Sequence, residues 1–314
     1  MSDKRVLVVC GPTATGKTRL GIELARALGG EIVSADSMQI YRRMDIGTAK
    51  ATREERAAVP HHMLDVAEPE ENWSVARYVE EASRCCDGIL SRGKLPILVG
   101  GTGLYIDSLL AGREFAAESG DGALRAKLND DYERLGGEAM WRRLYAVDPA
   151  RAEKLAPTDR RRIVRALEVW EQTGKTITQH DEETRRLPPR YVAGRIVLSY
   201  ADRAALYARI DRRVDEMAAQ GLFEEAEALL ASGVPADCTA MQAIGYKEAA
   251  LALRGEISRG EALALIKQAS RRYAKRQLTW FRRAEGALWI EWDGEPDFAA
   301  AMEKIRNSEI WPSA

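Results

Sequence analysis

Residues 11–18, with the sequence GPTATGKT, have the residue types and spacing of a phosphate-binding loop. They follow the apolar residues 6–9 and precede residues 20–25, which have the pattern of a helix. The glycines let several backbone N–H groups turn toward one anion, and the helix N-terminus adds positive potential. We therefore expect a diphosphate or polyphosphate here, with Lys17 as a point charge and the Thr18 hydroxyl as a ligand of Mg²⁺. The residues assigned to this site are Gly11, Pro12, Thr13, Ala14, Thr15, Gly16, Lys17 and Thr18.

Two further polar residues follow strand-like runs. Asp36 comes directly after residues 31–35, and Thr102 comes shortly after residues 95–99. Ligands of open α/β sheets bind beyond the carboxyl ends of the strands, so we expect both side chains beside the phosphate loop. Both residue types also cap helices and turns, and that interpretation stays open for each.

The strand-like residues 95–99 run into Gly100 and Gly101 rather than into an acid. Many nucleotide-hydrolysing proteins with this loop hold Mg²⁺ with an acid at such a strand end. Its absence argues against a small-molecule or nucleotide kinase, although we expect ATP to bind the loop weakly. An RNA-binding protein that is regulated by a nucleotide and performs no chemistry is a second alternative, against which Asp36 argues.

The elements that must position these residues indicate an α/β protein. Strand-like runs recur at residues 31–35, 95–99, 195–199 and 287–292, each after a stretch of helical pattern. This order is typical of a parallel sheet wrapped by helices. Residues 112–187 contain no strand-like run and read as a helical insertion. We therefore expect a core domain of residues 1–112 and 195–314, with an insertion domain of residues 113–194.

Bulk properties exclude some classes of protein. The 314 residues carry a net charge of −1, so any surface for nucleic acid must be local. No signal pattern precedes the first strand and no run has the length of a membrane span, so we expect no membrane partner and a cytoplasmic protein. The four cysteines include no CxxC pair, which makes structural zinc unfavourable and fits a reducing compartment.

Two helical stretches concentrate basic residues, one at residues 160–165 and one at residues 271–276. Like charges four residues apart repel on a helix, so contact with a polyanion would explain the second stretch. The alternative is a solvated helix face in which Trp280 and Phe281 are core residues.

Taken together, the motifs of this chain resemble those of bacterial tRNA dimethylallyltransferases, also called tRNA isopentenyltransferases. The resemblance spans nearly the whole chain. Beyond the phosphate loop it rests on SADSMQIYRRMDIGTAK (34–50), PHHMLDV (60–66), LVGGTGLY (98–105), RRIVRALEVWEQTGK (161–175), MQAIGYKE (241–248) and RRYAKRQLTWFRR (271–283). Two places depart from the family, which often has Gln-Arg where this chain has Arg161-Arg162, and Tyr or Phe in place of Trp73.

The resemblance implies a fold like that of P-loop kinases, with a helical insertion that helps to grip tRNA. It also implies transfer of a dimethylallyl group from its diphosphate to the N6 amine of an adenosine beside the tRNA anticodon, at position 37. Asp36, Thr102 and Lys17 are then the expected catalytic residues. The tRNA contacts it implies are Asp36, Ser37, Met38, Gln39, Thr102, Arg125, Arg161, Arg162, Ile163, Val164, Arg165, Met241, Gln242, Ala243, Ile244, Gly245, Tyr246, Arg271, Arg272 and Lys275.

This reaction would use the loop to stabilise a leaving diphosphate, together with Mg²⁺. The adenine N6 amine is a weak nucleophile, and the carboxylate of Asp36 is suited to accept its proton. The target base must leave its stack to reach such a site. The expected partners are the tRNA anticodon stem-loop and dimethylallyl diphosphate, and we expect a monomer of the bacterial type.

Overall fold

A computed structural model describes residues 4–113, 115 and 122–310 of the chain. It divides into two compact units, Met1–Leu110 with Arg190–Ala314 and Ala111–Pro189. The second boundary lies earlier than residues 194–195, where the sequence placed it. The reason is that Val192 and Gly194 already pair with Arg5 and Leu7 of the first strand, so strand pairing binds this segment to the first unit.

The first unit is built on a parallel sheet in the order β3-β2-β4-β1-β5-β6. This confirms the α/β class and the parallel sheet that the strand-like runs predicted. The strands are β1 (Arg5–Cys10), β2 (Gly30–Ser34), β3 (His61–His62), β4 (Leu95–Gly100), β5 (Val192–Tyr200) and β6 (Leu288–Trp292). The sequence analysis missed β3, because two half-buried histidines carry no strand pattern. The edge strand is tied to β2 by His62, whose Nε2 lies 2.7 Å from a carboxylate oxygen of Glu31.

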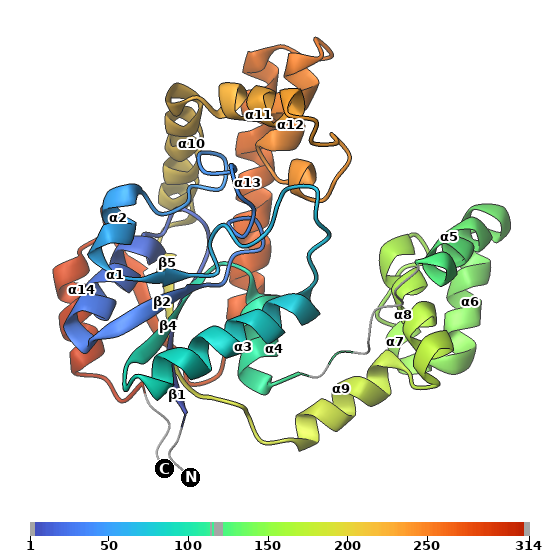
Figure 1. The fold of residues 1–314 in the computed structure, drawn as a ribbon, viewed down its shortest axis with the longest axis horizontal. Helices are drawn as coiled ribbons and strands as arrows, with labels where there is room; N and C mark the ends of the chain where they lie inside the picture. The colour runs from blue at the N-terminus through green and yellow to red at the C-terminus, as the bar shows by residue number, and fades with distance from the viewer. Residues whose placement is uncertain (1–3, 114, 116–121, 311–314) are drawn as a thin grey trace. The chain divides into compact units, whose positions relative to one another are not determined.

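Helices cover both faces of this sheet (Figure 1). Figure 1 shows α1 and α14 on one side of the strands and α3 and α4 on the other. This follows from the strand order, because the step from β1 to β2 and the step from β3 back to β4 run in opposite directions, and right-handed crossovers then use opposite faces. The helices of this unit are α1 (Lys17–Leu28), α2 (Arg53–Ala58), α3 (Val75–Ser91), α4 (Gly103–Ala111), α10 (Arg203–Gln220), α11 (Leu222–Ala231), α12 (Tyr246–Leu253), α13 (Arg259–Phe281) and α14 (Phe298–Arg306), with a short 3₁₀ turn, η1 (Ala240–Gln242).

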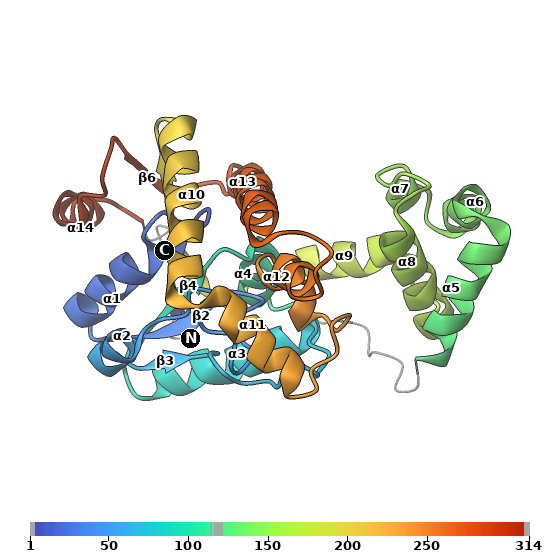
Figure 2. The same ribbon diagram turned by 90° about the horizontal axis from the view of Figure 1, so that it is seen from above.

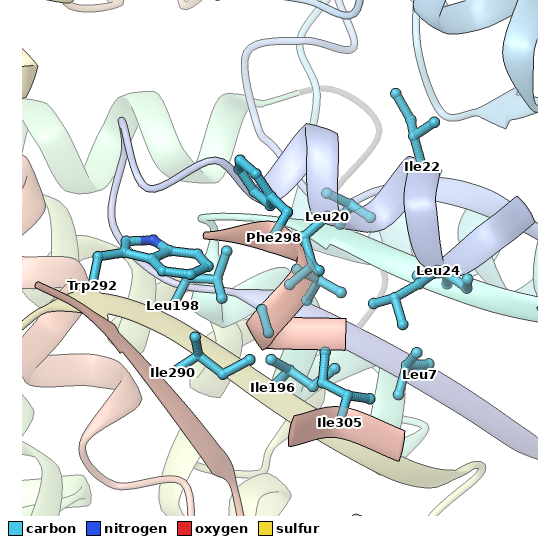
Figure 3. Close-up of a cluster of buried hydrophobic side chains, with 14 of the residues drawn as sticks. Leu7, Leu20, Ile22, Leu24, Ile196, Leu198, Ile290, Trp292, Phe298 and Ile305 are labelled. Carbon is cyan, nitrogen blue, oxygen red and sulfur yellow. The ribbon is translucent and has the colours of Figure 1, made fainter. Parts of the chain in front are cut away.

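The core on the α1 side of the sheet lies directly beneath the phosphate loop (Figure 3). Trp292 of β6 donates its indole N–H to the carbonyl of Thr15 at 2.9 Å. A β-carbon on Gly16 would lie 2.7 Å from the ring of Phe298. The loop therefore rests on a packed apolar support that fixes its backbone.

A group of helices lies beside the C-terminal ends of the strands. Helix α10 packs against α13, and α12 packs against both α11 and α13. Figure 2 shows these helices gathered over the end of the sheet to which the phosphate loop belongs. Their shared core includes Phe223, Met241 and Tyr246.

The second unit is helical, as residues 112–187 predicted. Its helices are α5 (Ala123–Leu135), α6 (Gly137–Val147), α7 (Pro149–Ala152), α8 (Arg160–Thr173) and α9 (Ile177–Arg186). Leu128, Met140, Leu144 and Leu167 form the centre of its core. No helix in the described part of either unit has the length and apolar character needed to cross a membrane.

Candidate functional site

The phosphate loop joins the end of β1 to the start of α1, where the sequence placed it. Gly11 has φ 140° and its β-carbon would lie 2.3 Å from the carbonyl oxygen of Leu198, so a side chain has no room there. Ala14 adopts a positive φ of 64° without being glycine. Lys17 Nζ donates to the carbonyl of Pro12 at 2.6 Å, which holds the ammonium group over the loop.

A cavity of about 320 Å³ lies between this loop and α10, and we call it the phosphate cavity. Cations enter it from two elements, Lys17 from the loop and Arg213 from α10. Burial, together with the nearby charge of Arg213, lowers the pKa of Lys17 to about 8, while the charge of Asp36 opposes this. Burial also lowers the pKa of Arg213, and no carboxylate within the described residues forms an ion pair with either cation. Two desolvated cations that lack a carboxylate partner favour an anion between them.

A second cavity of about 280 Å³ adjoins the first, and we call it the apolar cavity. Its wall is formed largely by α10 and α13, from which Ile210, Val214, Met217, Ile266 and Tyr273 line it. Thr13, Asp36, Thr48 and Arg213 line both cavities. One end of the site is thus suited to phosphate and the adjoining part to an apolar group or a base.

Asp36 stands where the two cavities meet. Its Oδ1 accepts hydrogen bonds from the backbone N–H of Met38 at 2.9 Å and of Gln39 at 3.4 Å. The turn interpretation from the sequence therefore applies to Oδ1. Among the described residues nothing hydrogen-bonds Oδ2, so the carboxylate keeps an acceptor for a ligand.

Thr102 lies beside the turn that carries Asp36. Its Oγ1 accepts from the backbone N–H of Ser37 at 3.1 Å, and its own N–H donates to the carbonyl of Ala35 at 3.1 Å. It lines neither of the two cavities in the described part of the chain. Thr102 therefore holds the turn that carries Asp36.

Sequence reasoning missed the contribution of α10. The run ARIDRRVDEM carries Arg209, Arg212 and Arg213, all of which line the phosphate cavity. Arg209 donates to the carbonyl of Ala14 at 3.1 Å, so α10 also holds the loop. The sequence did contain a signal for this helix, because the apolar residues near these arginines recur at the spacing of an amphipathic helix.

Sequence reasoning also missed Gln277 of α13. Its side chain accepts from the N–H of Thr13 at 3.0 Å and donates to the carbonyl of Gly101 at 2.9 Å. A β-carbon on Gly101 would lie 2.2 Å from the Gln277 amide nitrogen, so the glycine makes room for this link. Gln277 thereby joins the phosphate loop to the residues that follow β4.

Four members of the expected tRNA-binding set have buried side chains. The side chains of Ile163, Val164, Met241 and Tyr246 pack in the cores of their units, so only their backbone could contact an RNA. These apolar side chains pack in the hydrophobic cores, which could not be predicted from the motifs alone. Close to these positions, Gln242, Ala243, Ile244 and Gly245 line the apolar cavity.

In the second unit, Arg161 and Arg162 are exposed, as an RNA contact requires. Arg125 and Arg165 both donate to Glu168, whose side chain is fully buried. The buried carboxylate of Glu168 therefore accounts for the presence of Arg125 and Arg165 without any contact to RNA. Arg125 is half exposed and remains a candidate contact.

The basic face of α13 is smaller than the sequence indicated. Arg271 forms an ion pair with Asp211 of α10 at 2.5 Å, so an intramolecular partner accounts for it. Arg272 and Lys275 are exposed, one turn apart, and neither pairs with a carboxylate in the described residues. Phe281 is buried as expected, but Trp280 is 37% exposed and its indole N–H donates to Asp107 at 2.7 Å, so its expected core position is wrong.

We expect the double variant Arg272→Glu with Lys275→Glu to weaken tRNA binding and leave dimethylallyl diphosphate binding unchanged. Each lost phosphate contact should flatten the slope of log affinity against log salt by about 0.7–0.9. Titration of tRNA at several salt concentrations measures this slope. Arg26→Glu with Arg306→Glu, two exposed residues of α1 and α14, is the control with the same change of charge. An equal loss of affinity in both double variants would assign the effect to net charge and not to α13.

Comparison with known proteins gives one consistent family. A family model described as IPP transferase matches residues 39–284, and one described as isopentenyl transferase matches residues 4–66. The chain is 48% identical over 306 residues to a tRNA dimethylallyltransferase of Acetivibrio thermocellus, covering 98% of this chain and 96% of the relative. It is 49% identical over 293 residues to one of Geobacter metallireducens, covering 93% and 94%.

Solved structures agree with this. A full-length tRNA isopentenylpyrophosphate transferase of Bacillus halodurans is 40% identical, with a TM-score of 0.72 over 97% of this chain and 95% of that one. A eukaryotic dimethylallyltransferase, solved acting on tRNA, is 30% identical, with a TM-score of 0.74 over 88% of this chain and 69% of that one.

Proposed function

This chain belongs to the IPP transferase family, and we propose that it transfers a dimethylallyl group from dimethylallyl diphosphate to the N6 amine of an adenosine beside the tRNA anticodon, at position 37. The general activity, modification of a tRNA adenosine by a dimethylallyltransferase, follows from the family and from near-full-length similarity. The proposal adds which residues bind the substrates and take part in the reaction. The observation that supports their roles best is the position of Asp36, which lines both the phosphate cavity and the apolar cavity.

The diphosphate lies in the phosphate cavity, bound by the loop N–H groups, Lys17 and Arg213. The dimethylallyl chain points toward the apolar cavity, where the adenine enters. The bond between C1 and the bridging oxygen breaks with its electron pair on the diphosphate, and a bond forms between N6 and C1. Asp36 accepts the proton that N6 loses. The loop and the two cations stabilise the charge that grows on the leaving diphosphate.

We expect Mg²⁺ to be bound at this site mainly by the phosphates of the substrate. The described residues contain no group of three or more His, Cys, Asp or Glu side chains arranged to hold a metal ion. Mg²⁺ commonly binds through substrate phosphates with few protein ligands, and Thr18, which lines the phosphate cavity, would supply its hydroxyl as one of them. When bound, the ion would neutralise charge on the departing diphosphate.

The exposed Arg272 and Lys275 of α13, with Arg161, Arg162 and Arg125 of the second unit, are proposed to contact the tRNA backbone. The second unit serves as an insertion domain that grips the tRNA. The target adenine must leave its stack to enter the apolar cavity. The form proposed to act is a monomer.

The decisive experiment mixes the protein, Mg²⁺, tRNA and dimethylallyl diphosphate. We expect tRNA-dependent release of diphosphate and a mass gain of one dimethylallyl group on an adenosine, read by nucleoside mass spectrometry. A parallel reaction with γ-labelled ATP and no tRNA should transfer no label to small acceptors, because β4 ends at Gly100 without an acid. Label transfer at the rate of a kinase, about 1–100 s⁻¹, would replace the proposal with the kinase alternative.

A further inference from the structure

Residues 45–49 form a loop that borders the whole site, and we call it the wall loop. Thr48 lines the phosphate cavity and the apolar cavity, and Gly47 lines the apolar cavity. Ala49 lines the phosphate cavity and also a third cavity of about 670 Å³, whose lining includes Asp45 and Thr18. The wall loop belongs to no helix or strand, so its shape depends on contacts from elsewhere.

The side chain of Glu225, from α11, supplies the main such contact. Its two carboxylate oxygens accept hydrogen bonds from three consecutive backbone N–H groups of the wall loop. These are Asp45 at 2.8 Å, Ile46 at 2.9 and 3.1 Å, and Gly47 at 3.1 Å. Successive N–H groups that converge on one point form an anion-binding concavity. In this protein the anion is a side chain 180 residues away along the chain.

Tyr246 of α12 completes the arrangement. Its hydroxyl donates to Glu225 Oε1 at 2.5 Å, and burial together with the Glu225 charge raises the pKa of this phenol. A β-carbon on Gly47 would lie 2.5 Å from the Tyr246 ring, so the wall loop is packed against the same two residues that bind it. The carboxylate thus receives four donors from two segments.

The wall loop in turn contacts the residue that holds Asp36. The Gln39 side-chain amide donates to the carbonyls of Thr48 at 3.2 Å and Ala49 at 3.3 Å. Its oxygen accepts from Ser34 Oγ at 3.1 Å, and its backbone N–H donates to Asp36 Oδ1 at 3.4 Å. Hydrogen bonds therefore connect Glu225 to one half of the wall loop and Gln39 to the other half, and Gln39 in turn binds Asp36.

We propose that Glu225 is a positioning residue for the transfer reaction, which acts by holding the wall loop against the phosphate cavity and so fixing Asp36 through Gln39. Glu225 itself lines none of the three cavities described above, so it touches no reacting atom. The inference rests on the proposed function. It predicts that loss of the carboxylate damages use of dimethylallyl diphosphate, while binding of the tRNA backbone, which we assign to exposed basic residues of α13 and of the second unit, is retained.

Glu225→Gln tests this with a side chain of the same size. Its amide keeps one acceptor oxygen but puts an NH₂ donor where the second oxygen accepts from backbone N–H groups, so the wall loop should be held less firmly although the fold is kept. We expect kcat/KM for dimethylallyl diphosphate to fall by about ten- to a hundredfold, since a displacement near 1 Å costs about 10²-fold. The tRNA dissociation constant should match that of the wild type. Glu227→Ala, an exposed glutamate on the same helix, is the matched control and should keep wild-type kinetics.

Glu225→Ala adds a readout that a loss of folding cannot imitate. This variant leaves the three N–H groups without their carboxylate, so added acetate should occupy them and restore part of the lost rate. The comparison uses chloride at equal ionic strength and the wild type as references. Wild-type kcat/KM in Glu225→Gln, or a defect in Glu225→Ala that acetate does not relieve, would overturn the role of Glu225. An inactive wild-type protein would instead overturn the proposed function.

Discussion

Asp36→Asn should retain tRNA binding and lose most of the transfer rate. The amide keeps an oxygen that can accept from the N–H groups of Met38 and Gln39, so the turn is preserved. It cannot accept the proton that the N6 amine loses. Loss of a positioned general base costs about 10²–10⁴-fold in rate, and single-turnover measurement of prenylated adenosine reads it directly.

Asp293→Asn is the control for this variant, since Asp293 is an exposed aspartate of the same unit and lines neither reaction cavity. It should react at the wild-type rate. A single-turnover rate for Asp36→Asn close to that of the wild type would remove Asp36 from the chemistry and leave it a turn residue.

Lys17→Ala should have the second largest effect, on both the rate and its dependence on pH. In the proposed reaction the ammonium group stabilises the growing charge of the leaving diphosphate, so kcat should fall more than substrate affinity. In the wild type the pKa of Lys17 is about 8, below its ordinary value. Lys17 is therefore charged below about pH 8 and becomes neutral as the pH rises through it, so kcat/KM for dimethylallyl diphosphate should decline above that pH.

The alkaline decline should be absent from the kcat/KM profile of Lys17→Ala, because that profile reports groups of the free protein. Lys154→Ala, an exposed lysine of the second unit, should keep the decline. Persistence of the same decline in Lys17→Ala would assign it to another group. Normal turnover of Lys17→Ala at saturating substrate would mean that the loop does not bind the reacting diphosphate.

Local patterns explain why so much of the site could be predicted. A phosphate loop needs its glycines, lysine and threonine within eight consecutive residues, and a buried strand and a helix must flank it. Asp36 was found by a similar rule, because the carboxyl ends of parallel strands meet at one edge of the sheet. The phosphate loop, the parallel sheet and the helical second unit could therefore be predicted without knowledge of any tertiary contact. The family followed from motifs distributed along the chain.

Other features depend on partners that are distant in the sequence. Arg271 and Asp211 lie 60 residues apart and their ion pair removes Arg271 from the basic face. The phosphate cavity gains Arg213 only because α10 packs against α13 over the end of the sheet. Ile163 and Met241 belong to sequence motifs of the family, yet their side chains are buried. The sequence could not predict this, because a motif does not reveal which face of its helix or turn points inward.

By itself, then, the sequence predicted which residue types approach a diphosphate, since one loop and the end of one strand carry them. Only the tertiary structure decided what stands opposite them and what holds them in place. Glu225 binds three N–H groups that lie 178 to 180 residues away, and backbone donors leave no signature in a sequence. The physical reason is that covalent order fixes neighbours along the chain, whereas the burial of α10 against α11 and α13 selects the neighbours in space.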